Sequence, residues 1–125
     1  MIEYKADLNV KNEISDTVLH YASDYKSRSI PFLLELKCDP NAKNTEGDTP
    51  FNLFCMYEYD YLLIREFLKH KADPNIKSKN GNSTFLMCCK SDNEDLIISF
   101  LIYGADINLK YFEVSKFFFF FSFFY

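Results

Sequence analysis

Tryptophan is absent from this 125-residue sequence, and glycine and histidine are rare, with three and two residues. Three scattered glycines cannot form the glycine-rich loop that surrounds a bound phosphate. The two histidines, His20 and His70, are the only side chains expected to act as general bases near neutral pH. No serine or cysteine is paired with either of them in a recognisable motif. The sequence therefore predicts no catalytic residues and no cofactor.

The sequence also lacks a long apolar segment and a cluster of charge of one sign. No run reaches the roughly 20 apolar residues that a transmembrane helix needs, and no apolar stretch near Glu3 suggests a signal peptide. The formal net charge is -4, from 14 basic and 18 acidic residues that are scattered along the chain. This distribution argues against nucleic acid or an anionic membrane as the partner. We therefore expect a cytoplasmic or nuclear protein with no membrane span.

A four-residue motif, Ala-Asp-x-Asn or a close variant of it, recurs at a period of about 33 residues. The copies are Ala6-Asp7-Leu8-Asn9, Cys38-Asp39-Pro40-Asn41, Ala72-Asp73-Pro74-Asn75 and Ala105-Asp106-Ile107-Asn108. A fixed period of this length indicates one structural unit that is stacked repeatedly, so that each unit buries its apolar face on its neighbours. The sequence thus predicts a single solenoid domain, and it favours binding over catalysis as the function.

Each period contains two segments that we expect to form helices. The first begins at a hydroxyl side chain, which can cap the free amide groups of a helix start, and these residues are Thr17, Thr49 and Ser83. Pro50 then occupies the first helical position, where its missing N–H costs nothing. The second segment contains an apolar run with helical spacing, at 30–34, 64–68 and 97–101. Each unit is therefore predicted to hold a first helix and a second helix.

Turn residues mark the link from one unit to the next. Gly47 and Gly81 supply the positive φ that a tight turn needs, while Ser15 takes this place in the first unit without the conformational freedom of glycine. The connection between the two helices varies in length, which a stacked fold tolerates at its surface. In the shortest unit Pro31 falls in the first turn of a late second helix, with Ser29 as the candidate cap.

These residues resemble the ankyrin repeat, whose pattern runs D-x-x-G-x-T-P-L-H-x-A-A, then a second helix with a Leu-Leu pair, then G-A-D-x-N. The resemblance covers about residues 1–110, and it is carried by Thr17-Val18-Leu19-His20-Tyr21-Ala22, Thr49-Pro50-Phe51 and Tyr103-Gly104-Ala105-Asp106-Ile107-Asn108. It implies an all-α solenoid of stacked helix pairs with β-hairpin loops, in which loops and first helices form one concave surface. We expect units at about 9–40, 41–74 and 75–107, a partial repeat at 1–8, and a Phe-rich tail at 111–125 outside any recognisable repeat.

The aromatic tract at 117–125 has three interpretations. Nine residues are too few to span a membrane. The rings could instead form a hydrophobic cap over the third unit. The tract could also be a non-native end from a truncated or misread coding sequence, which the overall excess of Phe, Asn, Lys, Ile and Tyr favours. An uncapped apolar end would promote end-to-end self-association of the solenoid, so we expect the chain without this tract to be more soluble.

The four cysteines take places that small packing residues occupy. Cys38 replaces the Ala of the motif, while Cys55, Cys88 and Cys89 take the Ala-Ala places of the first helices. Two adjacent cysteines lack the two-residue spacer of a zinc-binding pair. We therefore expect four packing thiols and no metal site.

The two histidines have structural interpretations. The resemblance implies that His20, in the Thr-x-x-His place, makes hydrogen bonds within and between repeats. His70 lies between two lysines at the end of a second helix, where cations complement the negative end of the helix dipole.

We interpret the chain as a protein–protein interaction module that has no catalytic activity and whose partner is another protein. Residues that face neither neighbouring unit are free to contact a partner, so the candidate contacts lie on loop tips, on the exposed face of the first helices and at the rim. They are Asn44, Glu46, Asp48, Asn52, Tyr57, Tyr59, Lys77, Lys79, Asn82 and Leu86. The alternative is a structural or spacer fragment of a longer multidomain ankyrin repeat protein whose activity lies outside this chain.

Overall fold

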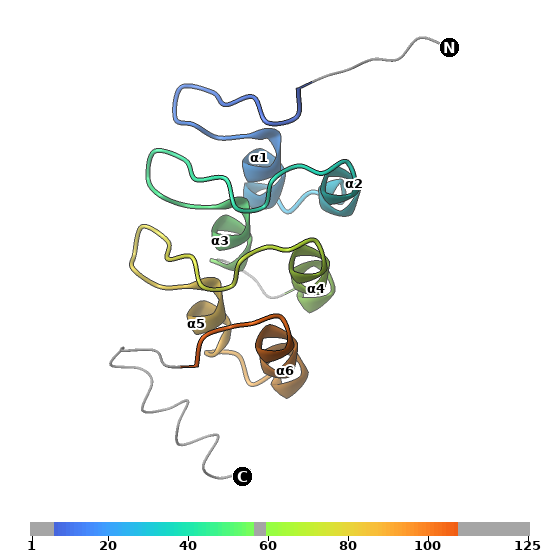
Figure 1. Cartoon of the computed structure of the whole chain (residues 1–125), viewed down its shortest axis with the longest axis vertical. Coiled ribbons are helices and arrows are strands. Elements are labelled where there is room, and N and C mark those ends of the chain that lie inside the picture. Colours follow the sequence, from blue (N-terminus) through green and yellow to red (C-terminus); the bar gives the residue numbers. More distant parts are fainter. Residues whose placement is uncertain (1–6, 57–59, 108–125) are drawn as a thin grey trace.

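The computed structural model describes residues 7–56 and 60–107. They form three helix pairs: α1 (Val18–Asp24) with α2 (Ile30–Glu35), α3 (Pro50–Cys55) with α4 (Tyr61–Lys69), and α5 (Thr84–Cys88) with α6 (Glu94–Ile102). Figure 1 shows the pairs stacked one above another, with loops that project to the same side. The predicted all-α solenoid is therefore confirmed. The Phe-rich tract and its interpretations lie outside the described residues.

Each first helix begins at the predicted residue. Thr17, Thr49 and Ser83 are N-caps in extended backbone, and their hydroxyl oxygens accept backbone N–H groups at 3.4, 3.0 and 3.2 Å. In α1 and α3 the side chains of His20 and Asn52 accept the N–H of the cap residue in return. This reciprocal capping box satisfies two free donors at each helix start.

The second helices begin differently from one another. Asp60 and Asn93 cap α4 and α6, so these helices begin earlier than the predicted apolar runs. Helix α2 begins at Ile30, the first residue of its predicted apolar run, with Pro31 in its first turn as predicted. The prediction of Ser29 as a side-chain cap is wrong. The backbone of Ser29 is helical (φ -78°, ψ -8°), and its side chain makes no capping bond. Its hydroxyl instead lies 2.7 Å from the hydroxyl of Ser27.

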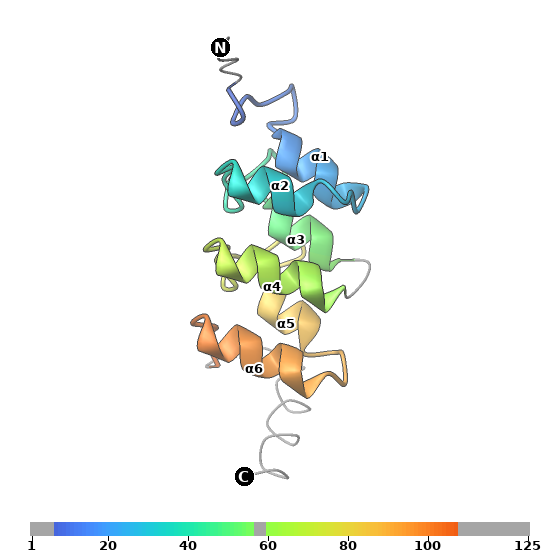
Figure 2. The same ribbon diagram turned by 90° about the vertical axis from the view of Figure 1, so that its right-hand side faces the viewer.

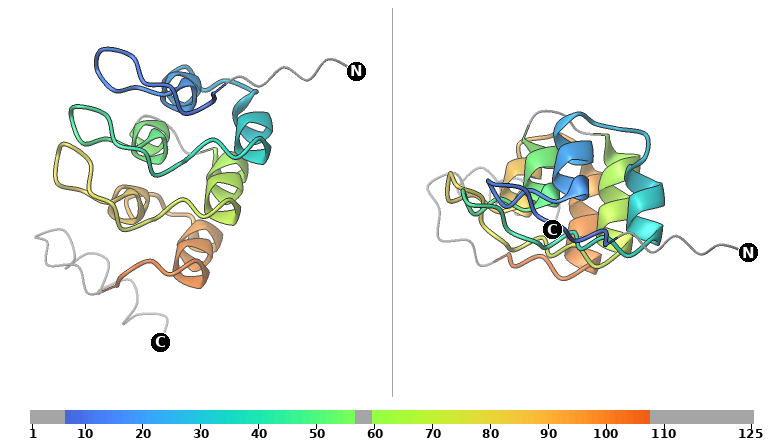
Figure 3. Two further views of the ribbon diagram at one scale, coloured as in Figure 1. Left: turned by 45° about the horizontal axis from the view of Figure 1, so that its top comes forward. Right: turned by 90° about the horizontal axis from the view of Figure 1, so that it is seen from above.

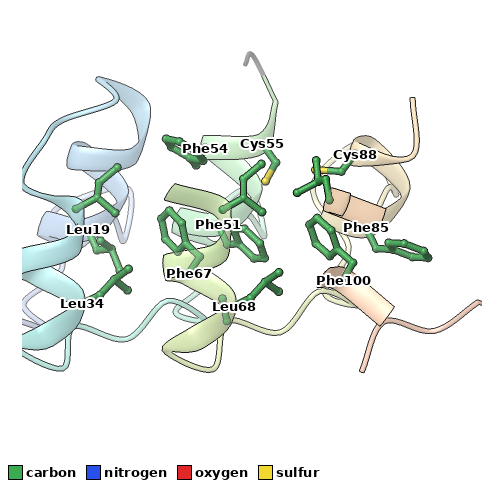
Figure 4. Close-up of a cluster of buried hydrophobic side chains, with 14 of the residues drawn as sticks. Leu19, Leu34, Phe51, Phe54, Cys55, Phe67, Leu68, Phe85, Cys88 and Phe100 are labelled. Atoms are coloured by element: carbon green, nitrogen blue, oxygen red, sulfur yellow. The ribbon is translucent and has the colours of Figure 1, made fainter. Parts of the chain in front are cut away.

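The helices form two columns that share one core. The first helices α1, α3 and α5 stack in one column and the second helices α2, α4 and α6 in the other (Figure 2). The ring of Phe51 in α3 stacks on Phe67 of α4 and on Phe100 of α6, with centroids 5.0 and 5.9 Å apart. Figure 4 shows this cluster of rings between the columns. Because the core is continuous from unit to unit, each unit depends on its neighbours for burial.

The loops lie side by side along the stack, at an angle to the helices (Figure 3). Ser15, Gly47 and Gly81 adopt positive φ values of 61°, 85° and 79°, at the predicted turn positions. The expected β-hairpin ladder does not form in the described loops, whose strand pairing is limited to an isolated antiparallel bridge between Lys77 and Ser83. The loops are therefore closed turns rather than strand pairs.

Candidate functional site

One asparagine side chain closes the loop between α2 and α3. Oδ1 of Asn44 accepts the backbone N–H groups of Glu46 and Asp48, both at 3.0 Å, and its backbone carbonyl accepts the N–H of Gly47 at 3.0 Å. Oδ1 of Asn12 closes the preceding loop in the same way, with two backbone N–H groups at 3.1 and 2.9 Å. These bonds occupy donors that a hairpin ladder would use. They fix the shape of each loop tip without strands.

Neighbouring loops are bonded to one another. Nδ2 of Asn44 donates to Oδ1 of Asp16 at 2.9 Å. One loop further on, the backbone N–H of Lys79 donates to Oδ1 of Asp48 at 2.7 Å, and its Nζ donates to Oε2 of Glu46 at 3.0 Å. The exposed ion pair between Lys79 and Glu46 contributes little to stability. The part-buried bonds that Asp16 and Asp48 accept hold each loop against the next. The three loops therefore form one row with a fixed spacing.

The ten candidate contact residues fall into four groups. Glu46, Lys77 and Lys79 are exposed, Asn44 and Asn82 are half-buried, Asp48, Asn52 and Leu86 are buried, and Tyr57 and Tyr59 lie outside the described residues. The exposed and half-buried residues all belong to the row of loops. A contact with a partner stays a prediction for these five.

The expectation of an exposed side chain is wrong for Asp48, Asn52 and Leu86, which are 0, 0 and 5% exposed. The Asp48 carboxylate is directed at the following loop. Asn52 accepts the N–H of its own cap residue through Oδ1 at 3.0 Å, and its Nδ2 donates to the carbonyl of Ile76 in the next unit at 3.1 Å. Asp48 and Asn52 therefore point along the stack instead of out of it. None of these three side chains offers a surface to a partner.

His20 joins two units from the place in α1 that Asn52 has in α3. Its Nδ1 accepts the backbone N–H of Thr17 at 3.0 Å, so the ring hydrogen is on Nε2. Nε2 then donates to the backbone carbonyl of Asp48 at 2.9 Å. The predicted bonding within and between units is therefore confirmed. A fully buried ring with both nitrogens hydrogen-bonded is a structural group.

The asparagine of the recurring motif ties one second-helix end to the next. Nδ2 of Asn41 donates to the carbonyl of Lys71 at 3.0 Å, and its Oδ1 accepts the backbone N–H of Asp73 at 2.7 Å. Asn75 repeats both bonds with the following unit, at 3.0 and 2.7 Å. Sequence analysis found the motif but not this role. The motif thus carries the contact between units on the side of the second-helix ends.

The cysteines behave as packing groups. Cys38, Cys55 and Cys88 are buried, and Cys89 packs partly exposed against the core. Burial raises the pKa of the Cys38 thiol, and burial together with the neighbouring Cys88 raises the pKa of Cys55 well above its usual value. The same two causes raise the pKa of Cys89 to about 12. Figure 4 shows Cys55 on α3 and Cys88 on α5 within the apolar cluster. In the ranges 7–56 and 60–107 no three metal-binding side chains come together.

Sequence analysis named Lys77 but missed its equivalents Lys11 and Lys43, and it also missed the exposed tyrosine of α1. Lys11, Lys43 and Lys77 each follow the Asn of the motif by the same offset, and all three are exposed. Their signal is the recurrence of Asn-x-Lys in register with the motif. On α1, Tyr21 is 57% exposed, and its ring centroid lies 5.3 Å from that of Tyr25. These residues add cationic groups and aromatic area to the surface of the loops and first helices.

The side of the second helices has a different surface. Two hollows of about 470 and 600 Å³ lie there, and both are lined by Lys69 and Tyr103. The larger one also contacts Pro31 and Leu62. None of the ten candidate contact residues lines either hollow. This side therefore provides a reference surface for tests of the loop row.

Comparison with known proteins gives a match over most of the chain. A family model for ankyrin repeats, in three copies, matches residues 19–111. The transient receptor potential cation channel subfamily A member 1 homolog of Caenorhabditis elegans is 42% identical over 60 residues, which make up 46% of this chain and 5% of that protein. The chain thus corresponds to a small part of this relative. In the part of the chain that the structure describes, no helix has the length and apolar character to cross a membrane.

Proposed function

We propose, because the chain belongs to the ankyrin repeat family, that it is a protein-recognition module without catalytic activity. The partner is another protein, and it docks on the row of loops and on the exposed face of the first helices. Glu46, Lys77 and Lys79 supply charged contacts, and Asn44 and Asn82 supply polar ones. Tyr57 and Tyr59 remain candidate rim contacts on the basis of sequence alone.

The observation that carries this proposal is the bonding between loops. Lys79 donates to Asp48 through its backbone and to Glu46 through its side chain, and Asn44 joins the preceding loop through Asp16. Loops that are already held in place lose little conformational entropy when a partner binds. Such a row favours recognition of one protein surface over adaptive binding of many.

The state of the titratable groups supports a binding role rather than a catalytic one. Both nitrogens of His20 are engaged within the fold, and Nδ1 of His70 lies 2.9 Å from the carbonyl of Glu66 at the end of α4. The raised pKa values of Cys55 and Cys89 keep these thiols neutral, and a neutral thiol is a poor nucleophile. Four free cysteines also fit a reducing compartment, the cytoplasm or nucleus.

A second candidate function is that of a structural or spacer segment within a longer multidomain protein. The observation in its favour is that the aligned residues make up only 5% of the relative. In this case the array would hold other domains apart, and its row of loops would have no protein partner of its own.

Site-specific photo-crosslinking separates the two candidates. A benzophenone amino acid replaces Thr45 or Lys77 on the row of loops, or Arg65 or Lys69 on the outer side of α4; all four side chains are exposed. The variants are expressed in cells, irradiated, and the crosslinked proteins are identified by mass spectrometry. Circular dichroism melts check that each variant is folded.

A recognition module predicts a protein that crosslinks from both loop positions and not from the two positions on α4. A spacer predicts the same low background from all four positions. Crosslinks confined to Arg65 and Lys69 would contradict the proposed surface, because they would place the partner on the second helices.

A further inference from the structure

The loops carry a column of lysines in register. Lys11, Lys43 and Lys77 follow the motif asparagines Asn9, Asn41 and Asn75 at the same offset, and all three are exposed. Because the units stack with a constant orientation (Figure 1), equivalent residues of successive units lie above one another. The three lysines therefore form one cationic column that runs along the stack.

The charge of this column is not neutralised by the loops themselves. The side chains of Lys43 and Lys77 have no hydrogen bond or ion pair with other described residues, and Nζ of Lys11 reaches only the backbone carbonyl of Lys43 at 3.3 Å. Two of the loop carboxylates are engaged with other groups instead. Glu46 is paired with Lys79, and Asp16 accepts Nδ2 of Asn44. Lys43 and Lys77 thus carry ammonium groups that no carboxylate of the described loops neutralises.

We propose that this column binds an acidic peptide segment of the protein partner, lying along the stack with a carboxylate at about every third residue. This inference rests on the proposed function. Packed helices lie about 8–10 Å apart, which sets the spacing of the lysines from one unit to the next. A peptide in the polyproline II conformation has three residues per turn and advances about 3.1 Å per residue, so that every third side chain lies on one face and meets the next lysine.

The neighbouring carboxylates select a peptide over a nucleic acid. Asp7, Asp39 and Asp73 form an exposed acidic column near the lysines in sequence, and each accepts the backbone N–H of the motif asparagine through Oδ1 only. A nucleic acid carries a charge at every phosphate, so it would bring negative charge against this column. A peptide with uncharged residues between its carboxylates avoids that repulsion. The net charge of -4 also disfavours binding of a nucleic acid.

The test measures binding of a fluorescein-labelled peptide of about 15 residues, with Glu at every third position and Gly or Ser between, by fluorescence anisotropy with the full chain. The binding variant combines Lys11→Gln, Lys43→Gln and Lys77→Gln. The control variant combines Arg28→Gln, Arg65→Gln and Lys69→Gln, which removes the same charge from exposed residues elsewhere. A Gln-for-Glu peptide and a thymidine oligonucleotide of equal length are the control ligands.

We expect the parent and the control variant to bind the Glu peptide within twofold of each other, and the loop variant to bind it about tenfold more weakly. Binding should also weaken as the salt concentration rises from about 50 to 300 mM. Equal binding by the loop variant and the parent, or an equal loss in both variants, would overturn the proposal. Tighter binding of the oligonucleotide than of the peptide would also overturn it.

These outcomes are distinct from failure of the proposed function. If a protein crosslinks from Thr45 and Lys77 while the Glu peptide does not bind, the recognition surface stands and its partner is not acidic. If neither result appears, both proposals fail together.

Discussion

Asn41 and Asp73 lie in successive units and are joined by a hydrogen bond of 2.7 Å, from the backbone N–H of Asp73 to Oδ1 of Asn41. The other end of the same amide donates to the carbonyl of Lys71 at 3.0 Å. One side chain therefore satisfies a donor and an acceptor at the end of α4. These bonds connect the loop arm of one unit to the second helix of the next, so they couple the units on which the row of loops depends.

Replacement of Asn41 tests this coupling. Asn41→Ala removes both bonds and should lower the free energy of unfolding by about 1 kcal/mol, because water replaces only part of them at this half-exposed site. Asn41→Asp keeps an acceptor for Asp73 but places a charged oxygen against the carbonyl of Lys71, so it should cost at least as much. Thermal and urea melts measure both, with Asn80→Ala as the control in an exposed loop position. Equal stability of Asn41→Ala and the parent would contradict the assigned role.

Two hydroxyl residues at helix starts make a matched pair. Thr49 caps α3 through a 3.0 Å bond to the N–H of Asn52, whereas Ser29 makes no capping bond to α2. Thr49→Ala should therefore destabilise the chain by about 1 kcal/mol, and Ser29→Ala should leave the melt nearly unchanged. A comparison of the two urea denaturation curves decides the point. Equal losses would mean that hydroxyl content, and not capping geometry, controls stability.

The loop turns predict opposite effects of two substitutions. Gly47 has a φ of 85°, and a Cβ there would meet no atom within 4 Å, so Gly47→Ala should cost about 1 kcal/mol through backbone strain alone. Ser15 already bears that strain at a φ of 61°. Ser15→Gly should therefore be neutral or slightly stabilising, since relief of strain offsets the greater entropy of the unfolded chain. Calorimetric melts that show Ser15→Gly to be clearly destabilised would count against the assigned turn.

The buried thiols predict a loss of stability in alkali. Burial raises the pKa of Cys89 to about 12 from an ordinary value of 9.0, so the unfolded chain ionises this thiol at a lower pH than the folded chain does. Its contribution to stability is complete below pH 9 and is lost as the pH rises toward 12. Urea midpoints measured from pH 8 to 10.5 should fall, and they should fall less in Cys89→Ala. An unchanged slope in that variant would show that other groups control the decline.

Local features of the fold could be predicted from the sequence, because short-range hydrogen bonds determine them. Thr17, Thr49 and Ser83 begin their helices as expected, since a cap needs only the backbone of the following turn. The turn positions of Gly47 and Gly81 follow from the same local logic. The family model matches residues 19–111, which include Thr49, Ser83 and both glycines.

The direction of individual side chains could not be predicted in the same way. Asp48 and Asn52 have polar side chains in places next to a helix start, and only the position of the next unit shows that they are buried. The pair of Glu46 and Lys79 likewise depends on the spacing between loops. Exposure in a stacked array is set by neighbours that are distant in sequence, so the candidate site was predicted less well than the fold.

Lysine footprinting of the complex is the most direct measurement of where the partner binds. The full chain, alone or bound to the protein partner that crosslinking identifies, is treated briefly with an acetylating reagent. Mass spectrometry then gives the modification rate of each lysine. Recognition through the row of loops predicts that the rates at Lys43 and Lys77 fall several-fold in the complex while the rate at Lys69 on α4 stays the same. Protection of Lys69 with unchanged rates at Lys43 and Lys77 would contradict it.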